Sequence, residues 1–255
     1  MPKRGLEIAA KTKDFGAAMI TTLLLAASVS SSANFSYDTC LRLADRRPEE
    51  AFASAMEAKE AGAGIPAEHC AAVALVNLKQ YAVAGKLLDE LARRPSVESN
   101  ELRATLLGQA GNAWILAGQP ELAIASFTAA LALLPGEAQF LIDRARASAT
   151  LQKWAQAESD LTSALTSEPG SAEALVLRAG ARRAQNNLKG AIGDVTQALL
   201  LDPNNVEALV ERGLISLRQG NKGEARKDFA AVLAAAPASD AAESARKAIE
   251  KIDVK

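Results

Sequence analysis

The chain contains few of the residues from which catalytic and metal sites are usually built. Among 255 residues there are two cysteines and one histidine, and aromatic residues make up 4%. No glycine-rich phosphate loop, nucleophile elbow or paired-histidine motif is present. His69 lacks an evident nucleophile and orienting group for base catalysis. Adjacent helical residues point about 100° apart, so His69 and Cys70 do not converge on one ion, and with Cys40 they still lack a fourth ligand for zinc. We therefore expect no enzyme, no metal site and no cofactor; segment 34–100 is too short and alanine-rich to hide an active site.

The charge balance excludes another class of function. Lysine and arginine total 29 and aspartate and glutamate 30, which gives a formal net charge of −1. Nucleic-acid-binding proteins carry clearly basic surfaces, so we expect no nucleic-acid partner. Alanine dominates the apolar residues. This composition favours many thin helix–helix contacts rather than one thick hydrophobic core.

Four prolines recur at a fixed interval. The differences 169−135, 203−169 and 237−203 are each 34, and the residues are Pro135, Pro169, Pro203 and Pro237. A constant period of this length is typical of helix–turn–helix units stacked in a solenoid. Breakers such as Gly118 and Asn186 mark the turn inside a unit, whereas the second unit has only the weaker 151–154.

Three further columns of residues keep the same phase as the prolines. Small residues stand 24 positions before each proline: Gly111, Ala145, Ala179 and Gly213. Alanines stand 12 positions before it: Ala123, Ala157, Ala191 and Ala225. Large apolar residues stand eight positions before it: Phe127, Leu161, Val195 and Phe229. Small residues let two helix axes approach to about 8 Å, the large residue fills the adjoining gap, and proline ends the second helix. Each period therefore predicts two closely packed helices.

On these columns the chain resembles the tetratricopeptide repeat family. The repeats would span 104–137, 138–171, 172–205 and 206–239. Trp114 occupies the aromatic slot of the first helix, but Ser148, Arg182 and Ser216 replace it in later repeats. The resemblance implies an all-α, right-handed solenoid that binds other proteins.

The regions on either side of the four repeats are also expected to be helical. Residues 34–103 form a divergent region with one degenerate repeat, in which 79–88 aligns with the segment beginning at Gln119. A solenoid needs a polar cap at its end. Residues 240–255 fit such a capping helix, because apolar and charged residues alternate there with helical spacing.

The N-terminal segment has a different residue pattern from the repeats. Basic residues precede a short apolar run beginning at Phe15, and small residues follow up to Ala33. This order is typical of a secretory signal peptide, here 1–33. We expect a bacterial exported protein, most simply periplasmic. The alternatives are an uncleaved membrane anchor at 15–29 and a buried first helix.

Cys40 and Cys70 are expected to form a disulfide in an exported protein. Helices expected over 37–46, 49–61 and 67–80 place both cysteines about 12–13 Å above the same turn, at about 1.5 Å of rise per residue. The bridge then requires the first and third helices to be neighbours. Two buried free thiols are the alternative. We expect His69 to lie at a helix start and to form a local hydrogen bond.

In this family the first helices line a concave groove. Carried over by position, the partner-binding residues are Asn112, Ile142, Arg146, Val176, Arg183, Val210 and Arg218. An apolar stripe with arginines beside it favours an extended peptide or an amphipathic helix carrying acidic residues. Alternatively, the arginines are solvated or pair with Glu173, Glu207 and Glu211. Of the residues that hold a C-terminal carboxylate in some members, only Asn112 is present, so such a clamp is disfavoured.

Two functions remain open at this stage. The first is a non-enzymatic adaptor of the cell envelope that binds a protein partner in its groove. The second is a structural module whose outer faces mediate self-association or assembly of an envelope complex. The sequence does not name the partner.

Overall fold

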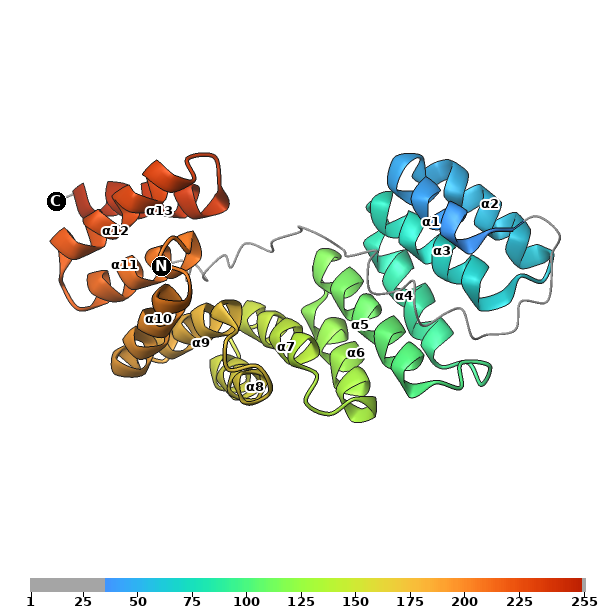
Figure 1. The fold of residues 1–255 in the computed structure, drawn as a ribbon, viewed down its shortest axis with the longest axis horizontal. Coiled ribbons are helices and arrows are strands. Elements are labelled where there is room, and N and C mark those ends of the chain that lie inside the picture. The colour runs from blue at the N-terminus through green and yellow to red at the C-terminus, as the bar shows by residue number, and fades with distance from the viewer. Residues whose placement is uncertain (1–34, 254–255) are drawn as a thin grey trace. The chain divides into compact units, whose positions relative to one another are not determined.

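The computed structural model describes residues 35–253, in which helices joined by turns are the only regular secondary structure (Figure 1). It contains thirteen helices and no strand. The described residues fall into two compact units, 35–135 and 136–253. The all-α solenoid expected from the period is confirmed: helices follow one another in pairs joined by short turns, and each packs on its neighbours in the chain within its unit.

The unit 35–135 contains six helices. They are α1 (Tyr37–Arg46), α2 (Pro48–Glu60), α3 (Gly64–Asn77), α4 (Tyr81–Ala92), α5 (Asn100–Leu116) and α6 (Pro120–Leu133). The first two agree closely with the predicted ranges. The third begins three residues earlier than predicted, at Gly64, so that Pro66 lies in the first turn of α3. Proline is tolerated there because the first N–H groups of a helix have no partner within it.

The unit 136–253 contains seven helices. They are α7 (Ala138–Thr150), α8 (Trp154–Ser167), α9 (Ala172–Ala184), α10 (Leu188–Leu201), α11 (Val206–Arg218), α12 (Lys222–Ala235) and α13 (Asp240–Asp253). Each predicted period over 138–239 holds one helix pair. The helix α13 packs on α11 and α12 through Ala242, Ala245 and Ala248. Its charged residues lie outside, as the predicted cap requires.

Large and small residues of the sequence columns meet in the core as pairs 16 positions apart. Where the second helix carries phenylalanine, the first carries glycine: a Cβ on Gly213 would lie 2.5 Å from Cε1 of Phe229, and a Cβ on Gly111 2.6 Å from Cζ of Phe127. The other two pairs combine alanine with a smaller aliphatic residue, and all four of their members are buried: Ala145 with Leu161 and Ala179 with Val195. A larger residue on the second helix is thus matched by a smaller one on the first, which keeps the helices of each pair at contact distance.

This pairing predicts opposite effects for two glycine-to-alanine changes. Gly213→Ala is expected to lower the free energy of unfolding by about 1–2 kcal/mol, because the added methyl group overlaps the Phe229 ring. Gly193→Ala in α10 is the control. Nothing lies within 4 Å of its Cβ position, so better helix propensity should raise stability by about 0.5–1 kcal/mol. Urea denaturation followed by circular dichroism measures both, and a stabilising Gly213→Ala would refute the pairing.

The turns within the repeats share one backbone feature. A residue with positive φ occurs every 34 positions, at Gly118, Gln152, Asn186 and Gly220. Glycine adopts this conformation freely and asparagine tolerates it, but glutamine does not favour it. The turn at Gln152, which had the weakest sequence signal, therefore adopts the same geometry as the others.

The N-terminal predictions lie outside the described residues. This applies to the signal segment 1–33 and to the alternative anchor at 15–29. Among the helices of 35–253, none combines the length and apolar character needed to cross a membrane.

Candidate protein-binding site

Three arginine–aspartate pairs fix the two helices of each repeat in the unit 136–253. In each pair the guanidinium donates through Nε and Nη2 to both carboxylate oxygens, at 2.6–3.0 Å. The pairs are Arg144 with Asp160, Arg178 with Asp194 and Arg212 with Asp228. All three aspartates are buried. The pairs repeat every 34 residues, a signal in the sequence that the column analysis missed. They orient the first helices α7, α9 and α11 on which a partner would bind.

The aromatic slot of the repeats holds a polar link between repeats. Trp114 donates from Nε1 to Asp89 on the preceding second helix α4, at 2.8 Å. At the equivalent position, Arg182 donates to Glu158 on the preceding second helix α8, also at 2.8 Å, and to Asp194. Arg182, which replaces the aromatic residue, therefore keeps the link to the previous repeat, through an ion pair in place of the tryptophan hydrogen bond.

Ion pairs join the first helices of successive repeats. The helices α7, α9 and α11 contact one another in order. Arg146 pairs with Asp143 at 2.8 Å and with Glu173 on α9. Arg183 on α9 pairs with Glu211 on α11. The structure thus realises the alternative in which the arginines pair with glutamates.

Two residues expected in the groove are not accessible to a partner. Arg183 is 6% exposed, and its partner Glu211 is buried with it. Ile142 is 3% exposed. The prediction that these two side chains are presented to a partner is therefore corrected. A buried, paired guanidinium is expensive to separate from its carboxylate, so Arg183 acts between repeats.

The accessible remainder is an apolar stripe, which we call the first-helix face. Val176 and Val210 are half-buried, and Leu214 and Leu217 continue the line along α11 with helical spacing. Arg218 at the end of α11 is exposed, and it forms no ion pair among the described residues. Asn112 lies in the other unit, on α5, and is half-buried.

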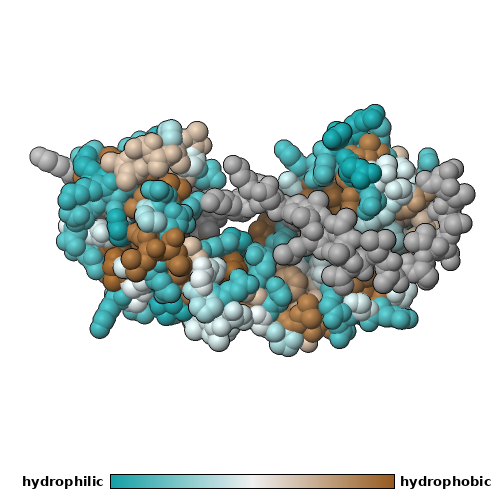
Figure 2. All heavy atoms as spheres, viewed as in Figure 1, coloured by the Kyte–Doolittle hydropathy of each residue, from teal (hydrophilic) through white to brown (hydrophobic). Residues whose placement is uncertain are grey.

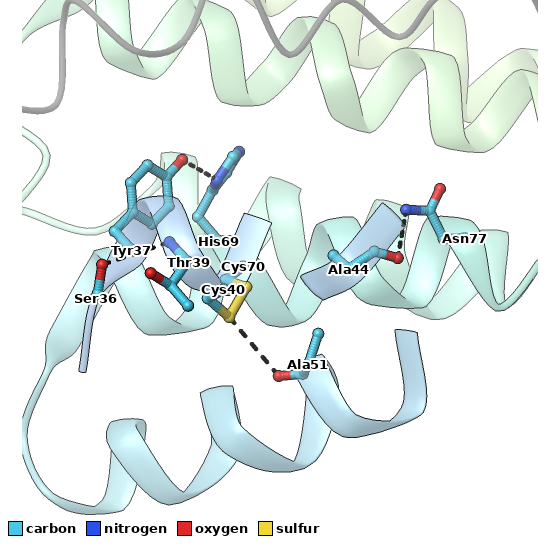
Figure 3. The surroundings of a disulfide bond; sticks show 9 residues. All are labelled: Ser36, Tyr37, Thr39, Cys40, Ala44, Ala51, His69, Cys70 and Asn77. Atoms are coloured by element: carbon cyan, nitrogen blue, oxygen red, sulfur yellow. Dashed lines mark hydrogen bonds between the residues drawn. A yellow bond between two sulfur atoms is a disulfide. The ribbon is translucent and has the colours of Figure 1, made fainter. Parts of the chain in front are cut away.

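A second polar cluster lies in the unit 35–135, on one turn of α3. Tyr37 Oη on α1 donates to Nδ1 of His69 at 2.7 Å (Figure 3). On the other side of the ring, Nε2 donates to Oε1 of Gln109 on α5 at 2.7 Å. The expectation of a local hydrogen bond is wrong, since these partners are 32 and 40 residues away. Burial lowers the pKa of His69, and only the bond to Gln109 opposes this. The neutral ring joins three helices.

Glu68 fixes two further segments to α3. Both of its oxygens accept from Arg94, which follows α4, and Lys59 on α2 lies 3.4 Å away. Burial raises the pKa of Glu68, but the hydrogen bonds and charges of Arg94 and Lys59 outweigh it and hold that pKa below its usual range. Glu68 therefore stays ionised and ties α2 and the end of α4 to α3.

Cys70, the next residue along α3, faces α1. Its sulfur lies at bonding distance from that of Cys40, and the two Cα atoms are 6.2 Å apart (Figure 3). The helices α1 and α3 are neighbours, as the bridge requires. Among residues 35–253, no group of histidine, cysteine, aspartate and glutamate is arranged to hold a metal ion. The cluster at 68–70 is therefore a structural junction of four helices and the segment after α4.

The buried imidazole predicts a pH dependence of stability. Unfolding exposes His69 and restores its ordinary pKa of about 6.5, so the unfolded chain binds an extra proton just below this pH. The contribution of the neutral His69 ring to the free energy of unfolding is complete above about pH 6.5. It is lost as pH falls through the lower pKa of the folded state. Unfolding free energies measured from pH 8 to pH 5 should decline more steeply for the native chain than for His69→Gln. Parallel curves would contradict this.

Comparison with known families agrees with the helix pairs described above. Two models of the tetratricopeptide repeat match the chain, one over residues 142–200 and one over 177–250. Residues 142–250 therefore contain tetratricopeptide repeats. Such repeats generally mediate protein–protein interaction, and neither model describes a catalytic domain. No curated protein sequence matches the chain significantly.

Solved structures show the same fold at low sequence identity. MamA from Desulfovibrio magneticus RS-1 (residues 41 to the end) is 22% identical with a TM-score of 0.54, over 66% of this chain and 97% of that one. A second crystal structure of MamA is 17% identical with a TM-score of 0.56, over 70% and 96%. The Cut9–Hcn1 complex of the APC/C is 17% identical with a TM-score of 0.61, over 84% of this chain but 42% of that one. These likenesses concern the fold alone.

Proposed function

We propose that this chain is a non-enzymatic adaptor that binds a protein partner on the first-helix face of residues 136–253. The observation that carries the proposal is the accessible apolar stripe of Val176, Val210, Leu214 and Leu217, supported from behind by the three arginine–aspartate pairs. A rigid surface presenting apolar side chains at helical spacing suits an amphipathic helix or an extended peptide.

The ion pairs along this face define the chemistry of the partner. Arg146 and Arg183 are already neutralised by Glu173 and Glu211. An acidic partner would have to displace these carboxylates and would gain little. The partner segment should therefore be mainly apolar on its bound side, with at most one acidic group placed near Arg218.

Affinity capture with paired variants tests this proposal. Val210→Glu places a charge in the middle of the stripe and should remove the captured partner, since an unpaired buried charge is costly. Lys227→Glu is the matched control, because Lys227 is exposed on α12, away from the first helices. Circular dichroism verifies that both variants fold. A partner retained by Val210→Glu, or lost equally with Lys227→Glu, would refute the assignment.

We further propose that the protein works in a bacterial cell envelope, in the periplasm after export. The apolar segment within 1–33 and the placement of Cys40 beside Cys70 support this, because disulfides persist in oxidising compartments. The alternative is an anchor at 15–29 that holds the repeats at the membrane. Fractionation of cells, with N-terminal sequencing of the mature chain, distinguishes them: a new N-terminus near Asn34 supports export and cleavage, and an intact chain in the membrane fraction supports the anchor.

A further inference from the structure

Ion pairs join the helix α9 to each of its neighbours α7, α8, α10 and α11. Apart from Leu175, the buried apolar residues of α9 are alanines, which offer little surface for packing. Four charged residues of α9 form the links: Glu173 with Arg146 of α7, Arg182 with Glu158 of α8, Arg178 with Asp194 of α10, and Arg183 with Glu211 of α11. Polar contacts therefore contribute much of the placement of this helix.

Two of these links join one first helix to the next, and they differ in burial. The side chains of Arg146 and Glu173 are 28% and 46% exposed, so water and salt weaken their attraction. The side chains of Arg183 and Glu211 are only 6% and 8% exposed, which leaves little room for water to replace either partner. The buried link joins α9 to α11, the two helices that carry the apolar stripe of the first-helix face.

The buried link reaches across the backbone of α9. Arg183 donates from Nε and Nη2 to the two carboxylate oxygens of Glu211, and Nη2 lies 3.3 Å from Oε2. A Cβ atom on Gly180 would lie 3.8 Å from Oε2, so the carboxylate packs on α9 where a side chain is missing. Two hydrogen bonds between planar groups fix an angle as well as a distance. Apolar contacts have no such direction.

Stability alone does not account for two charges at this depth. Replacing a buried ion pair by apolar side chains of similar size is often neutral or stabilising, because no charge then has to leave water. The best-attested use of a buried polar group is to fix the register of packed helices. The burial of Arg183 and Glu211 between two first helices therefore indicates a role in alignment.

We propose that Arg183 and Glu211 are a positioning pair for the partner-binding surface. On α9, Val176 lies one turn before Gly180, and on α11, Val210 immediately precedes the glutamate. The bonds that align the two helices therefore also set the spacing of the two valines. Hydrophobic side chains reach the surface in the region of α9–α11 (Figure 2). The pair acts through these neighbours and not by touching a partner, and its role rests on the proposed adaptor function.

A distance measurement on the full chain tests the alignment without any partner. The variant combines Arg183→Met with Glu211→Leu, because either change alone would leave a buried charge unpaired. Nitroxide labels replace Gln185 and Gln219, which are exposed at the ends of α9 and α11. Pulsed electron paramagnetic resonance should give one narrow distance distribution for the native pair and a broadened or shifted one for the variant.

Denaturation separates alignment from stability. The apolar variant should unfold at a denaturant midpoint equal to or above that of the native chain. The matched control combines Arg144→Met with Asp160→Leu, a buried-carboxylate pair that joins the two helices of one repeat. It should leave the distance between positions 185 and 219 unchanged. An unchanged distance in the Arg183–Glu211 variant, or a lowered midpoint, would overturn the positioning role.

Photo-crosslinking in cells from position 218 tests the consequence for binding. The apolar variant at 183 and 211 should reduce the yield of the partner adduct about tenfold, because misplaced apolar contacts weaken binding. The control variant at 144 and 160 should retain the yield. Equal yields from the native chain and the 183–211 variant would overturn the positioning role alone. No adduct from the native chain would instead refute the adaptor function, and with it the role of the pair in binding.

Discussion

Replacing Asp194 by alanine is expected to lower the free energy of unfolding by about 3 kcal/mol. Asp194 is 4% exposed and accepts hydrogen bonds from Arg178 at 2.7 and 3.0 Å and from Arg182 at 2.8 Å. Removal of the carboxylate leaves two mostly buried guanidinium groups without this partner, and breaking a buried pair from one side costs about 3–5 kcal/mol. The lower end applies because the arginine side chains retain 14% and 20% exposure.

The equivalent aspartate of the last repeat provides the control. Asp228 bonds only Arg212 in the same geometry, and that arginine is 39% exposed. Water can therefore replace the lost carboxylate, and Asp228→Ala should cost about 1 kcal/mol. Chemical denaturation monitored at 222 nm compares the two variants with the native chain. An equal decrease in the free energy of unfolding for the two variants would show that the second arginine and the deeper burial at Asp194 add no stability.

Reduction of a bridge between Cys40 and Cys70 is expected to destabilise the unit 35–135 by about 3–4 kcal/mol. The bridge closes a loop with a sequence separation of 30, and on the chain-entropy model a loop of this size restricts the unfolded chain by that amount. The helix α1 is held otherwise by its apolar contacts with α2 and α3 and by the Tyr37–His69 hydrogen bond. It should therefore be the first element to lose protection from hydrogen exchange.

The measurement compares oxidised and dithiothreitol-treated protein, with Cys40→Ser combined with Cys70→Ser as the control. The double variant should have the same stability as the reduced protein, both with and without dithiothreitol. A native chain whose denaturation midpoint is insensitive to the reductant would contradict the bridge and favour two free thiols. Exchange in α7–α13 should not change, because these helices belong to the other compact unit.

The helix pairs were predictable because each depends on local residue types at a fixed period. The prolines end the second helices, and the columns that include Gly213 and Phe229 describe the contact between helices almost completely. The early start of α3 could not be read from this pattern, since Pro66 is as compatible with a first turn as with a loop. The arginine–aspartate pairs recur with the same period and could have been found as two further columns, but only the folded helices show that the two columns bond to each other.

The candidate site was less predictable, because accessibility depends on the neighbouring repeat. The position of Arg183 on the first helix follows from the period, but its burial depends on Glu211, which comes from the next repeat. The repeat position of Ile142 likewise predicts which face of the helix carries this side chain, but it does not predict how deeply the side chain is buried. His69 shows the same limit, since its partners Tyr37 and Gln109 come from two other helices. Periodicity therefore locates a surface, and the three-dimensional contacts determine which of its side chains remain available.

Photo-crosslinking in cells from position 218 most directly tests the claim that the first-helix face binds a partner. Arg218 is exposed at the end of that face, and Lys227 on α12 serves as the control position. The account predicts that one other protein is captured from position 218 and not from position 227, and that Val210→Glu abolishes the capture. Capture of nothing from position 218, or of the same proteins from both positions, would contradict it.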